Sequence, residues 1–267
     1  FLYNVVGVTH SRSDSAAIRL VMDLLGRRNR AVYRRTPTYA KTAAVAGELQ
    51  AMGVPCAGVL LVGLDTAIIP QVTETRAALR ARLGLDPAAR YLLFVGRLDP
   101  YKRPLDVAGV LAALPVDWQA VVIGQGSLTE ELRRAMEAAG LAGRWRHIPK
   151  LPNEEVQLYY HACDVFLNCN DQEIFGMSLL EAMYAGCTPV ARRAPGPDEI
   201  IEDGVSGFLV PPAPGDTAAL AAAVEKAAAD PAMARAAETR IREHFLWRNS
   251  AEKALQMLRE KGVGTDG

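Results

Sequence analysis

The chain has 267 residues, and half of them are hydrophobic, which is enough for one or two domains with a sizeable core. Thirty Lys and Arg side chains balance thirty Asp and Glu, so the formal net charge is zero, which argues against nucleic acid as the main partner. No apolar run approaches the ~18 residues of a membrane-spanning helix. Four cysteines without metal-ligand spacing favour a reduced, cytoplasmic setting: Cys56, Cys163, Cys169 and Cys187.

The first 70 residues predict a small set of strands and helices. We expect strands over 3–8 and 58–62, a helix over 15–28 and a second helix that begins at residue 43. We assign residues 1–72 to a first, N-terminal domain.

From Tyr91 onward, short apolar strands alternate with amphipathic helices. The predicted strands are 91–96, 119–124, 144–148, 164–168, 188–191 and 207–210, and the predicted helices are 104–113, 128–139, 153–162, 177–185, 197–202 and 216–229. This alternation predicts an α/β fold, a doubly wound (Rossmann-like) parallel sheet with helices on both faces. We assign residues 73–240 to this domain. The amphipathic stretch 241–267 is expected to form a packing helix.

Several polar or small residues follow directly after predicted strands. They are Arg97, Gly124, Lys150, Glu173 and Pro195. Because ligands of open α/β sheets bind at the carboxyl ends of the strands, these residues are expected to meet at one edge.

Two glutamates, Glu173 and Glu181, flank a turn and the start of a helix in the run Glu173-Ile174-Phe175-Gly176-Met177-Ser178-Leu179-Leu180-Glu181. A glycine turn that opens a helix presents free N–H groups and the positive end of the helix dipole, which suits a diphosphate. Ionised carboxylates on each side can accept hydrogen bonds from sugar hydroxyls. The alternative is an ordinary strand, loop and helix with surface glutamates.

Two cations follow the strand that ends at Val95. Arg97 suits forked contacts with phosphate oxygens, and Lys102 acts as a point charge. A solvated basic turn is the alternative. Gly124 and Gly126 form a weaker signal, because a tight turn explains a Gly-x-Gly pair equally well.

The Glu173 to Glu181 run resembles the donor-binding motif of the retaining family 4 glycosyltransferases, which have the GT-B fold. The Gly96-Arg97 pair with Lys102, the segment 147–155 and the segments 194–201 and 203–211 resemble further parts of that family, over roughly residues 1 to 250. The resemblance implies transfer of a hexosyl group from a UDP- or GDP-sugar to an acceptor hydroxyl, with no cofactor. It implies that Glu173 holds the sugar and Glu181 the ribose hydroxyls. The residues implied as catalytic are Glu173, Arg97, Lys102 and His10, and those implied at the donor are Glu181, Phe175, Gly176, Met177, Ser178, Leu179, Gly124, Gly126, Lys150 and Leu151.

The same resemblance implies how the chain is divided. Residues 1–72 would be the end of an acceptor-side domain, 73–240 the donor domain, and 241–267 a helix that returns to the first domain. Roughly a hundred residues of a complete first domain would be absent before Phe1, so we expect donor binding with poor transfer. Leu61-Val62-Gly63 departs from the family's usual Pro-Asn-Gly at the linker.

The resemblance also bears on the metals and partners that we expect. No Asp-x-Asp pair is present, so we expect no metal, with cations at the diphosphate instead. The acceptor is expected to be a sugar or a lipid-linked molecule. A basic cluster could contact anionic lipid at the inner membrane face, or it is a solvated helix end: Arg27, Arg28, Arg30, Arg34 and Arg35. A nucleotide-sugar epimerase, another GT-B enzyme such as a phosphorylase, and a binding module without turnover remain alternative functions.

Overall fold

The computed structural model describes residues 4–6, 16–213 and 215–260. The predicted catalytic His10 lies outside these residues. The chain divides into two compact units, Phe1–Gly63 with Trp247–Gly267, and Leu64–Leu246. The sequence analysis placed these boundaries after residues 72 and 240. The functional roles assigned to the domains stay predictions.

The larger unit is built on a six-stranded sheet in which every strand pair is parallel, with the order β6-β5-β4-β7-β8-β9. Its strands are β4 (Arg90–Val95), β5 (Trp118–Ile123), β6 (Trp145–Ile148), β7 (Val165–Asn168), β8 (Thr188–Arg192) and β9 (Phe208–Val210). Its helices are α3 (Arg76–Arg82), η1 (Pro100–Lys102), α4 (Asp106–Ala113), α5 (Thr129–Ala138), α6 (Asn153–Ala162), α7 (Met177–Tyr184), α8 (Pro195–Ile200), α9 (Thr217–Ala229) and α10 (Pro231–His244). The predicted α/β Rossmann-like fold is confirmed.

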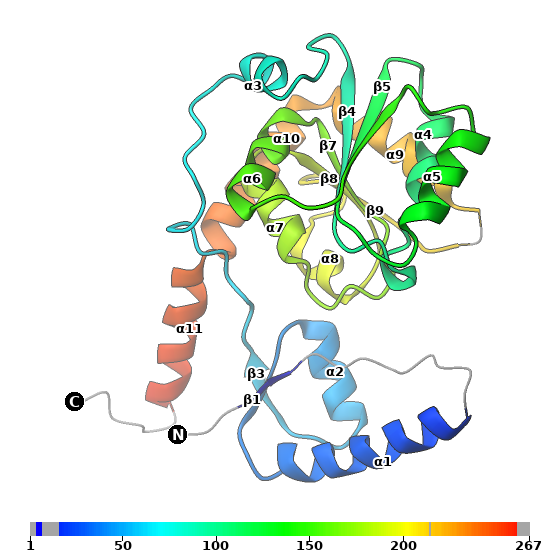
Figure 1. Cartoon of the computed structure of the whole chain (residues 1–267). Coiled ribbons are helices and arrows are strands. Elements are labelled where there is room, and N and C mark those ends of the chain that lie inside the picture. Colours follow the sequence, from blue (N-terminus) through cyan, green and yellow to red (C-terminus); the bar gives the residue numbers. More distant parts are fainter. Residues whose placement is uncertain (1–3, 7–15, 214, 261–267) are drawn as a thin grey trace. The chain divides into compact units, whose positions relative to one another are not determined.

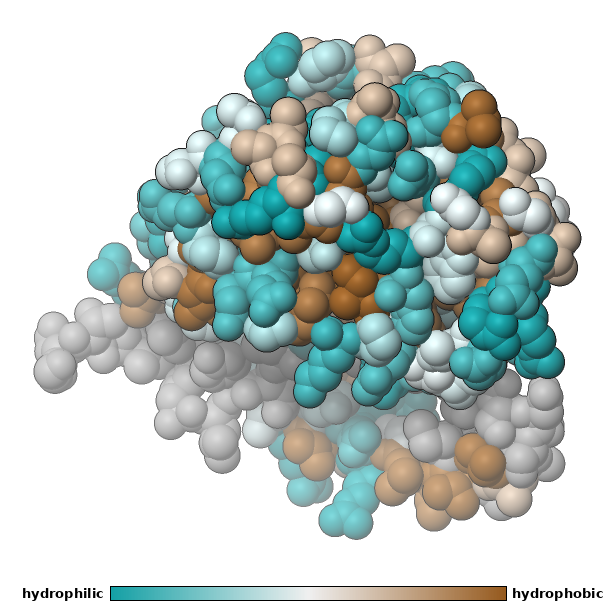
Figure 2. Space-filling view, turned by 45° about the horizontal axis from the view of Figure 1, so that its top comes forward, coloured by the Kyte–Doolittle hydropathy of each residue, from teal (hydrophilic) through white to brown (hydrophobic). Residues whose placement is uncertain are grey.

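Helices cover both faces of this sheet. Helices α4, α5 and α9 pack on one face, and α6, α7 and α10 lie on the other (Figure 1). The central strands are therefore largely buried on both faces rather than on alternate residues, and every residue of β7 and β8 is buried. Trp118, Leu92 and Val122 lie in the core beneath α4 and α9. On the surface, apolar residues appear only as small patches between polar ones on the face shown in Figure 2.

The carboxyl end of β8 carries a buried ion cluster. The Arg192 side chain is fully buried, and its guanidinium contacts the carboxylates of Asp216, at the start of α9, and Asp106, at the start of α4. It also donates to the backbone carbonyl of Cys169, after β7, at 2.8 Å. One cation therefore joins three loops at this edge of the sheet.

The smaller unit has a parallel sheet with the order β1-β2-β3, made of β1 (Asn4–Val6), β2 (Thr38–Ala40) and β3 (Cys56–Val59). It also contains α1 (Ala16–Tyr33), α2 (Ala43–Ala51) and α11 (Trp247–Glu260). The Thr42 hydroxyl caps α2 by accepting a bond from the Val45 N–H. Among the described residues, no helix is both long and apolar enough to cross a bilayer.

Several elements differ from the sequence expectation. Strand β2 was not predicted, because three residues are too few to show a period. Helices α3 and α10 were not predicted either. The predicted C-terminal helical segment starts inside α10. Helix α10 ends before Phe245, and a separate helix, α11, begins at Trp247. Strand β3 begins at Cys56, two residues before the predicted start at 58.

Replacing Asp216 with Asn should destabilise the larger unit, because Arg192 then stays buried with one carboxylate in place of two. We expect a loss on the order of 3 kcal/mol in the free energy of unfolding, measured by urea denaturation at neutral pH. The Arg192 guanidinium holds the pKa of the Asp216 carboxyl below its usual value. This stabilisation is therefore present at neutral pH and lost as the pH falls through the folded-state pKa, so the difference between the proteins should shrink in acid.

Asp117→Asn is the matched control. Asp117 pairs with Arg90 at 2.8 Å, but its side chain is half exposed. The loss in the free energy of unfolding should be clearly smaller for Asp117→Asn than for Asp216→Asn. Equal losses for the two variants would contradict the structural role assigned to Arg192.

Candidate functional site

The loops after β4 and β5 touch through their backbones. A Cβ atom on Gly124 would lie 1.8 Å from the Gly96 carbonyl oxygen, and one on Gly126 would lie 2.5 Å from the Leu98 carbonyl oxygen. Two backbone hydrogen bonds join the same loops, Leu98 N–H to Gln125 O at 3.1 Å and Leu128 N–H to Leu98 O at 2.8 Å. Both glycines are therefore required by close approach, in addition to the turn geometry that the sequence suggested.

Lys102 and Glu173 meet directly at this edge. The Lys102 ammonium lies 2.5 Å from Glu173 Oε2, which also accepts a bond from the Asn170 amide at 3.1 Å. The Glu173 carbonyl accepts the Gly196 N–H at 2.7 Å. The loop after β7 is thus held between η1 and the start of α8, and a cation and a carboxylate separated by 71 residues in the sequence form one pair.

Gly176 opens α7 in the left-handed conformation, with φ at 102°. A side chain at this position would be strained, so glycine allows the chain to turn from the Glu173 loop into the helix. Glycine also has no side-chain oxygen to cap the helix. The N–H groups of Met177 and Ser178 therefore lie at the positive end of α7 without an intrahelical acceptor.

Arg97 and Lys102 share an aromatic neighbour. Arg97 is exposed, and its guanidinium contacts the Tyr101 hydroxyl at 2.9 Å and Asp99 at 3.3 Å. The Arg97 guanidinium carbon and the Lys102 ammonium lie 5.4 and 5.5 Å from the centre of the Tyr101 ring. The sequence analysis gave Tyr101 no role, although its position between the two cations was a signal.

Glu181 lies farther along α7 and is half-buried. Its Oε2 accepts a hydrogen bond from the hydroxyl of Tyr160, a fully buried residue of α6, at 3.1 Å. Burial raises the pKa of the Glu181 carboxyl above its usual value, and the bond from Tyr160 opposes this. Sequence reasoning missed Tyr160 because it belongs to a different helix.

Arg103, the residue after Lys102, links the Lys102 turn to the loop that carries Glu173. It is the one non-glycine residue with positive φ in the described part of the chain, at 51°. Its guanidinium contacts Asp106 at 2.8 Å and Asp171, in the Glu173 loop, at 3.2 Å. Asp106 in turn contacts Arg192, so the ion cluster in the core continues to the site.

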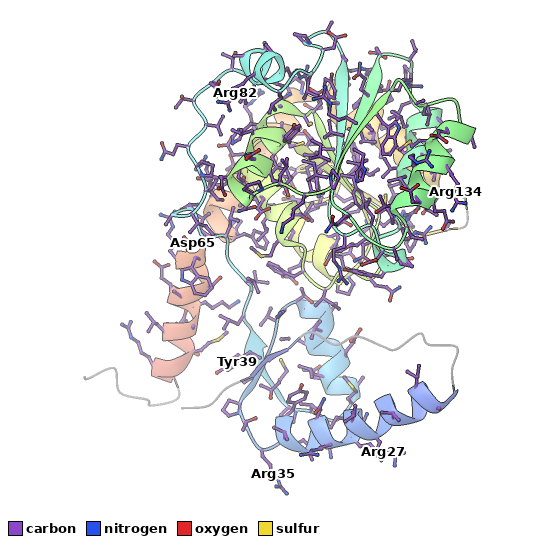
Figure 3. All side chains as sticks on the ribbon, in the orientation of Figure 1. Arg27, Arg35, Tyr39, Asp65, Arg82 and Arg134 are labelled. Carbon is purple, nitrogen blue, oxygen red and sulfur yellow. The ribbon has the colours of Figure 1, made fainter. Side chains whose placement is uncertain are left out.

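The remaining predicted residues lie apart from these contacts. Lys150 and Leu151 follow β6 on the same edge, with Lys150 exposed and its ammonium without a hydrogen bond to any described residue. In the basic cluster, Arg27 and Arg35 are exposed on the smaller unit (Figure 3), whereas Arg34 donates to the Gly53 carbonyl beyond the end of α2 at 2.9 Å. Within the described ranges, no group of three or more His, Cys, Asp or Glu side chains could hold a metal ion.

Residues 75–244 match the family described as "Glycosyl transferases group 1". The chain is 39% identical over 140 residues to a D-inositol 3-phosphate glycosyltransferase of Mycolicibacterium gilvum, covering 51% of this chain and 31% of the relative. It is 33% identical over 201 residues to the same-named protein of Saccharomonospora viridis, covering 70% of this chain and 46% of the relative. The chain thus spans less than half the length of these curated relatives.

Solved structures share the fold. Anabaena Alr3699/HepE, solved with UDP and glucose, superposes with a TM-score of 0.82 at 21% identity, over 97% of this chain and 71% of that chain. The sucrose-phosphate synthase of Thermosynechococcus elongatus superposes with a TM-score of 0.80 at 22% identity, over 98% of this chain and 68% of that chain. The chain belongs to the group 1 glycosyltransferase family, and its larger unit contains the matched region.

Arg103 supplies a test of the strained turn behind Lys102. Ala and Gly at position 103 both remove its two ion pairs, but only Gly relieves the positive φ. We expect the free energy of unfolding, measured by urea denaturation, to be about 1 kcal/mol higher for Arg103→Gly than for Arg103→Ala. At Arg133, inside helix α5, the same two substitutions should show the opposite order. Equal stability of Arg103→Ala and Arg103→Gly would show that the turn relaxes without glycine.

Proposed function

We propose that this chain carries the donor site of a retaining glycosyltransferase of the family 4 type, which moves a hexosyl group from a UDP- or GDP-sugar to an acceptor hydroxyl. The observation that carries the proposal is the Lys102–Glu173 pair, set beside the open N-terminus of α7 at the carboxyl edge of the sheet. Family membership and the named relatives support it.

The diphosphate would bind between Lys102, Arg97 and the N–H groups at the start of α7. A Lys ammonium has three N–H donors, so Lys102 can contact Glu173 and a phosphate oxygen together. Arg97 is exposed and tethered only within its own loop, so it is free to turn toward a phosphate. These groups would stabilise the negative charge that develops on the departing nucleoside diphosphate.

The carboxylates would select the sugars. Glu173, fixed by Lys102 and Asn170, would accept bonds from hydroxyls of the transferred hexose, and Glu181 from the ribose hydroxyls. Backbone from Phe175 to Leu179 would assist, and Gly124 and Gly126 would let the backbone approach the ligand. Lys150 and Leu151 would lie beside the nucleobase.

No protein nucleophile is assigned. In the proposed route the acceptor hydroxyl attacks from the face that the diphosphate leaves, and a leaving phosphate oxygen takes the acceptor proton, so the anomeric configuration is retained. Because Lys102 and Arg97 supply positive charge at the diphosphate, this step needs no divalent metal and no cofactor. His10 is proposed to face the transferred sugar.

The acceptor is proposed to be a sugar or a lipid-linked molecule, with the protein working in the cytoplasm. The relatives named above are D-inositol 3-phosphate glycosyltransferases, and an inositol phosphate carries several hydroxyls. Exposed Arg27, Arg28 and Arg35 would approach anionic lipid at the inner face of the membrane. Arg34 would contribute less, because its guanidinium already binds the backbone after α2.

Removing one cation tests the diphosphate site. Lys102→Ala and Arg97→Ala should each weaken UDP or GDP binding by several-fold to a hundredfold, because each loses a charge-assisted contact. Calorimetric titration with UDP, GDP, uridine and guanosine measures this, and the nucleosides should be little affected. Lys226→Ala, on the surface of α9, is the matched control and should bind like the parent. Equal losses for diphosphates and nucleosides would contradict the assignment.

Glu181→Gln tests the ribose contact. The variant should bind UDP and GDP several-fold more weakly while folding normally, since Gln keeps an acceptor for Tyr160. Burial raises the pKa of Glu181, so the parent loses stability as the pH rises from the unfolded-state pKa through the folded-state pKa. The Gln variant lacks this loss and should be at least as stable at neutral pH by thermal unfolding. Unchanged nucleotide affinity would remove Glu181 from the site.

A further inference from the structure

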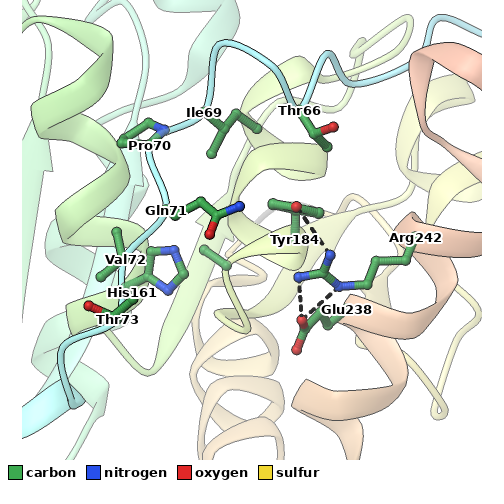
Figure 4. A pocket seen from close by; sticks show the side chains of 11 residues that line it. Thr66, Ile69, Pro70, Gln71, Val72, Thr73, His161, Tyr184, Glu238 and Arg242 are labelled. Atoms are coloured by element: carbon green, nitrogen blue, oxygen red, sulfur yellow. Dashed lines mark hydrogen bonds and ion pairs between the residues drawn. The ribbon is translucent and has the colours of Figure 1, made fainter.

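A cavity with a volume of about 430 Å³ lies within the larger unit, away from the Lys102–Glu173 pair. It is bounded by the irregular segment 66–73, the C-terminal ends of α6 and α7, and α10 (Figure 4). Helices α6 and α7 lead into β7 and β8, so their C-terminal ends lie at the amino edge of the parallel sheet. The cavity is therefore at the edge opposite the proposed donor site, and its size falls in the range of small-molecule sites.

One wall of this cavity has polar groups without partners. The Gln71 side chain and the His161 ring point toward the α7 and α10 side in Figure 4. Neither the Gln71 amide nor the His161 imidazole forms a side-chain hydrogen bond with any residue that the structure describes. Burial lowers the pKa of the His161 imidazole, so at neutral pH the ring is uncharged and offers one N–H donor and one nitrogen acceptor.

The opposite wall consists of an ion pair between Arg242 and Glu238, with the Arg242 guanidinium packed over the Tyr184 ring. Arg242 contacts Glu238 Oε1 at 2.8 Å, donates to the Tyr184 hydroxyl at 3.1 Å and lies 4.3 Å from the centre of the Tyr184 ring. The Tyr184 hydroxyl accepts this bond and keeps its own proton to donate. The second Glu238 oxygen keeps its acceptor capacity.

The charge of the lining excludes most ionic ligands. Arg242 and Glu238 cancel, and His161 is neutral, so the cavity has no net charge. An anion could only accept bonds, leaving the Gln71 oxygen and Glu238 without donors. A cation at the free Glu238 oxygen would lie beside the Arg242 guanidinium and be repelled by it. An apolar ligand would bury the free polar groups without partners.

We infer that this cavity binds a neutral saccharide, at a site separate from the nucleotide-sugar donor. Each sugar hydroxyl both donates and accepts, which matches donors and acceptors mixed on two facing walls. Gln71 and His161 contact the ligand from one wall, and Tyr184 and Glu238 contact it from the other. The inference does not depend on the proposed donor chemistry, because no residue is shared with the carboxyl edge.

The imidazole signal of His161 in proton–nitrogen NMR spectra reports on the cavity directly. We expect glucose, maltose or sucrose to shift this signal with saturable, millimolar-range affinity, while glucuronate, inorganic phosphate and 1,4-diaminobutane leave it in place. UDP at saturation should not compete with the sugar. The signal is assigned by its loss in His161→Phe.

Two variants and one control complete the test. His161→Phe and Gln71→Ala should weaken sugar binding at least tenfold by calorimetry and leave UDP binding unchanged. His244→Phe makes the same chemical change at an exposed residue of α10 outside the cavity, and it should bind sugar like the parent. The inference is overturned if none of the three sugars shifts the His161 signal, if an anion or the diamine shifts it instead, or if UDP displaces the sugar. Failure of UDP binding in the parent would count against the donor site alone.

Discussion

The buried guanidinium of Arg192 is the interaction on which the carboxyl edge of the sheet depends. A fully buried cation is costly unless carboxylates and carbonyls surround it, and here Asp216, Asp106 and the Cys169 carbonyl do so. Because these groups come from three different loops, satisfying one charge fixes the starts of α4 and α9 against the end of β7. These contacts therefore hold the three segments together at this edge.

The same network reaches the candidate site through alternating charges. Asp106 contacts both Arg192 and Arg103, and Arg103 contacts Asp171 in the loop that carries Glu173. Arg103 follows Lys102 directly and adopts a positive φ, a conformation that side chains normally avoid. The position of Lys102 relative to Glu173 is thus set by core electrostatics and a strained turn, which is the kind of support that precise ligand geometry requires.

The two edges of the sheet differ in their electrostatic character. At the carboxyl edge lie the N-terminus of α7 and two cations, the groups proposed to bind negative charge. At the amino edge, helix C-termini and a self-compensated Arg242–Glu238 pair leave a neutral, polar cavity. Opposite helix ends at opposite edges follow from the parallel topology, in which each helix runs against the strands that it joins.

The local signals in the sequence were enough to predict the parallel α/β sheet of the larger unit and the loop and turn that carry Glu173 and Gly176, but not the short helix η1 that carries Lys102. Alternating apolar strands and amphipathic helices repeat there at regular spacing, and glycine marks the turn before α7. The sequence could not show that Lys102 pairs with Glu173, that Tyr160 donates to Glu181, or that Arg103 joins two loops. Each of these contacts links residues on different elements, so only the packing of those elements decides it. The same holds for the cavity beside His161, whose walls come from four segments that are distant in the chain.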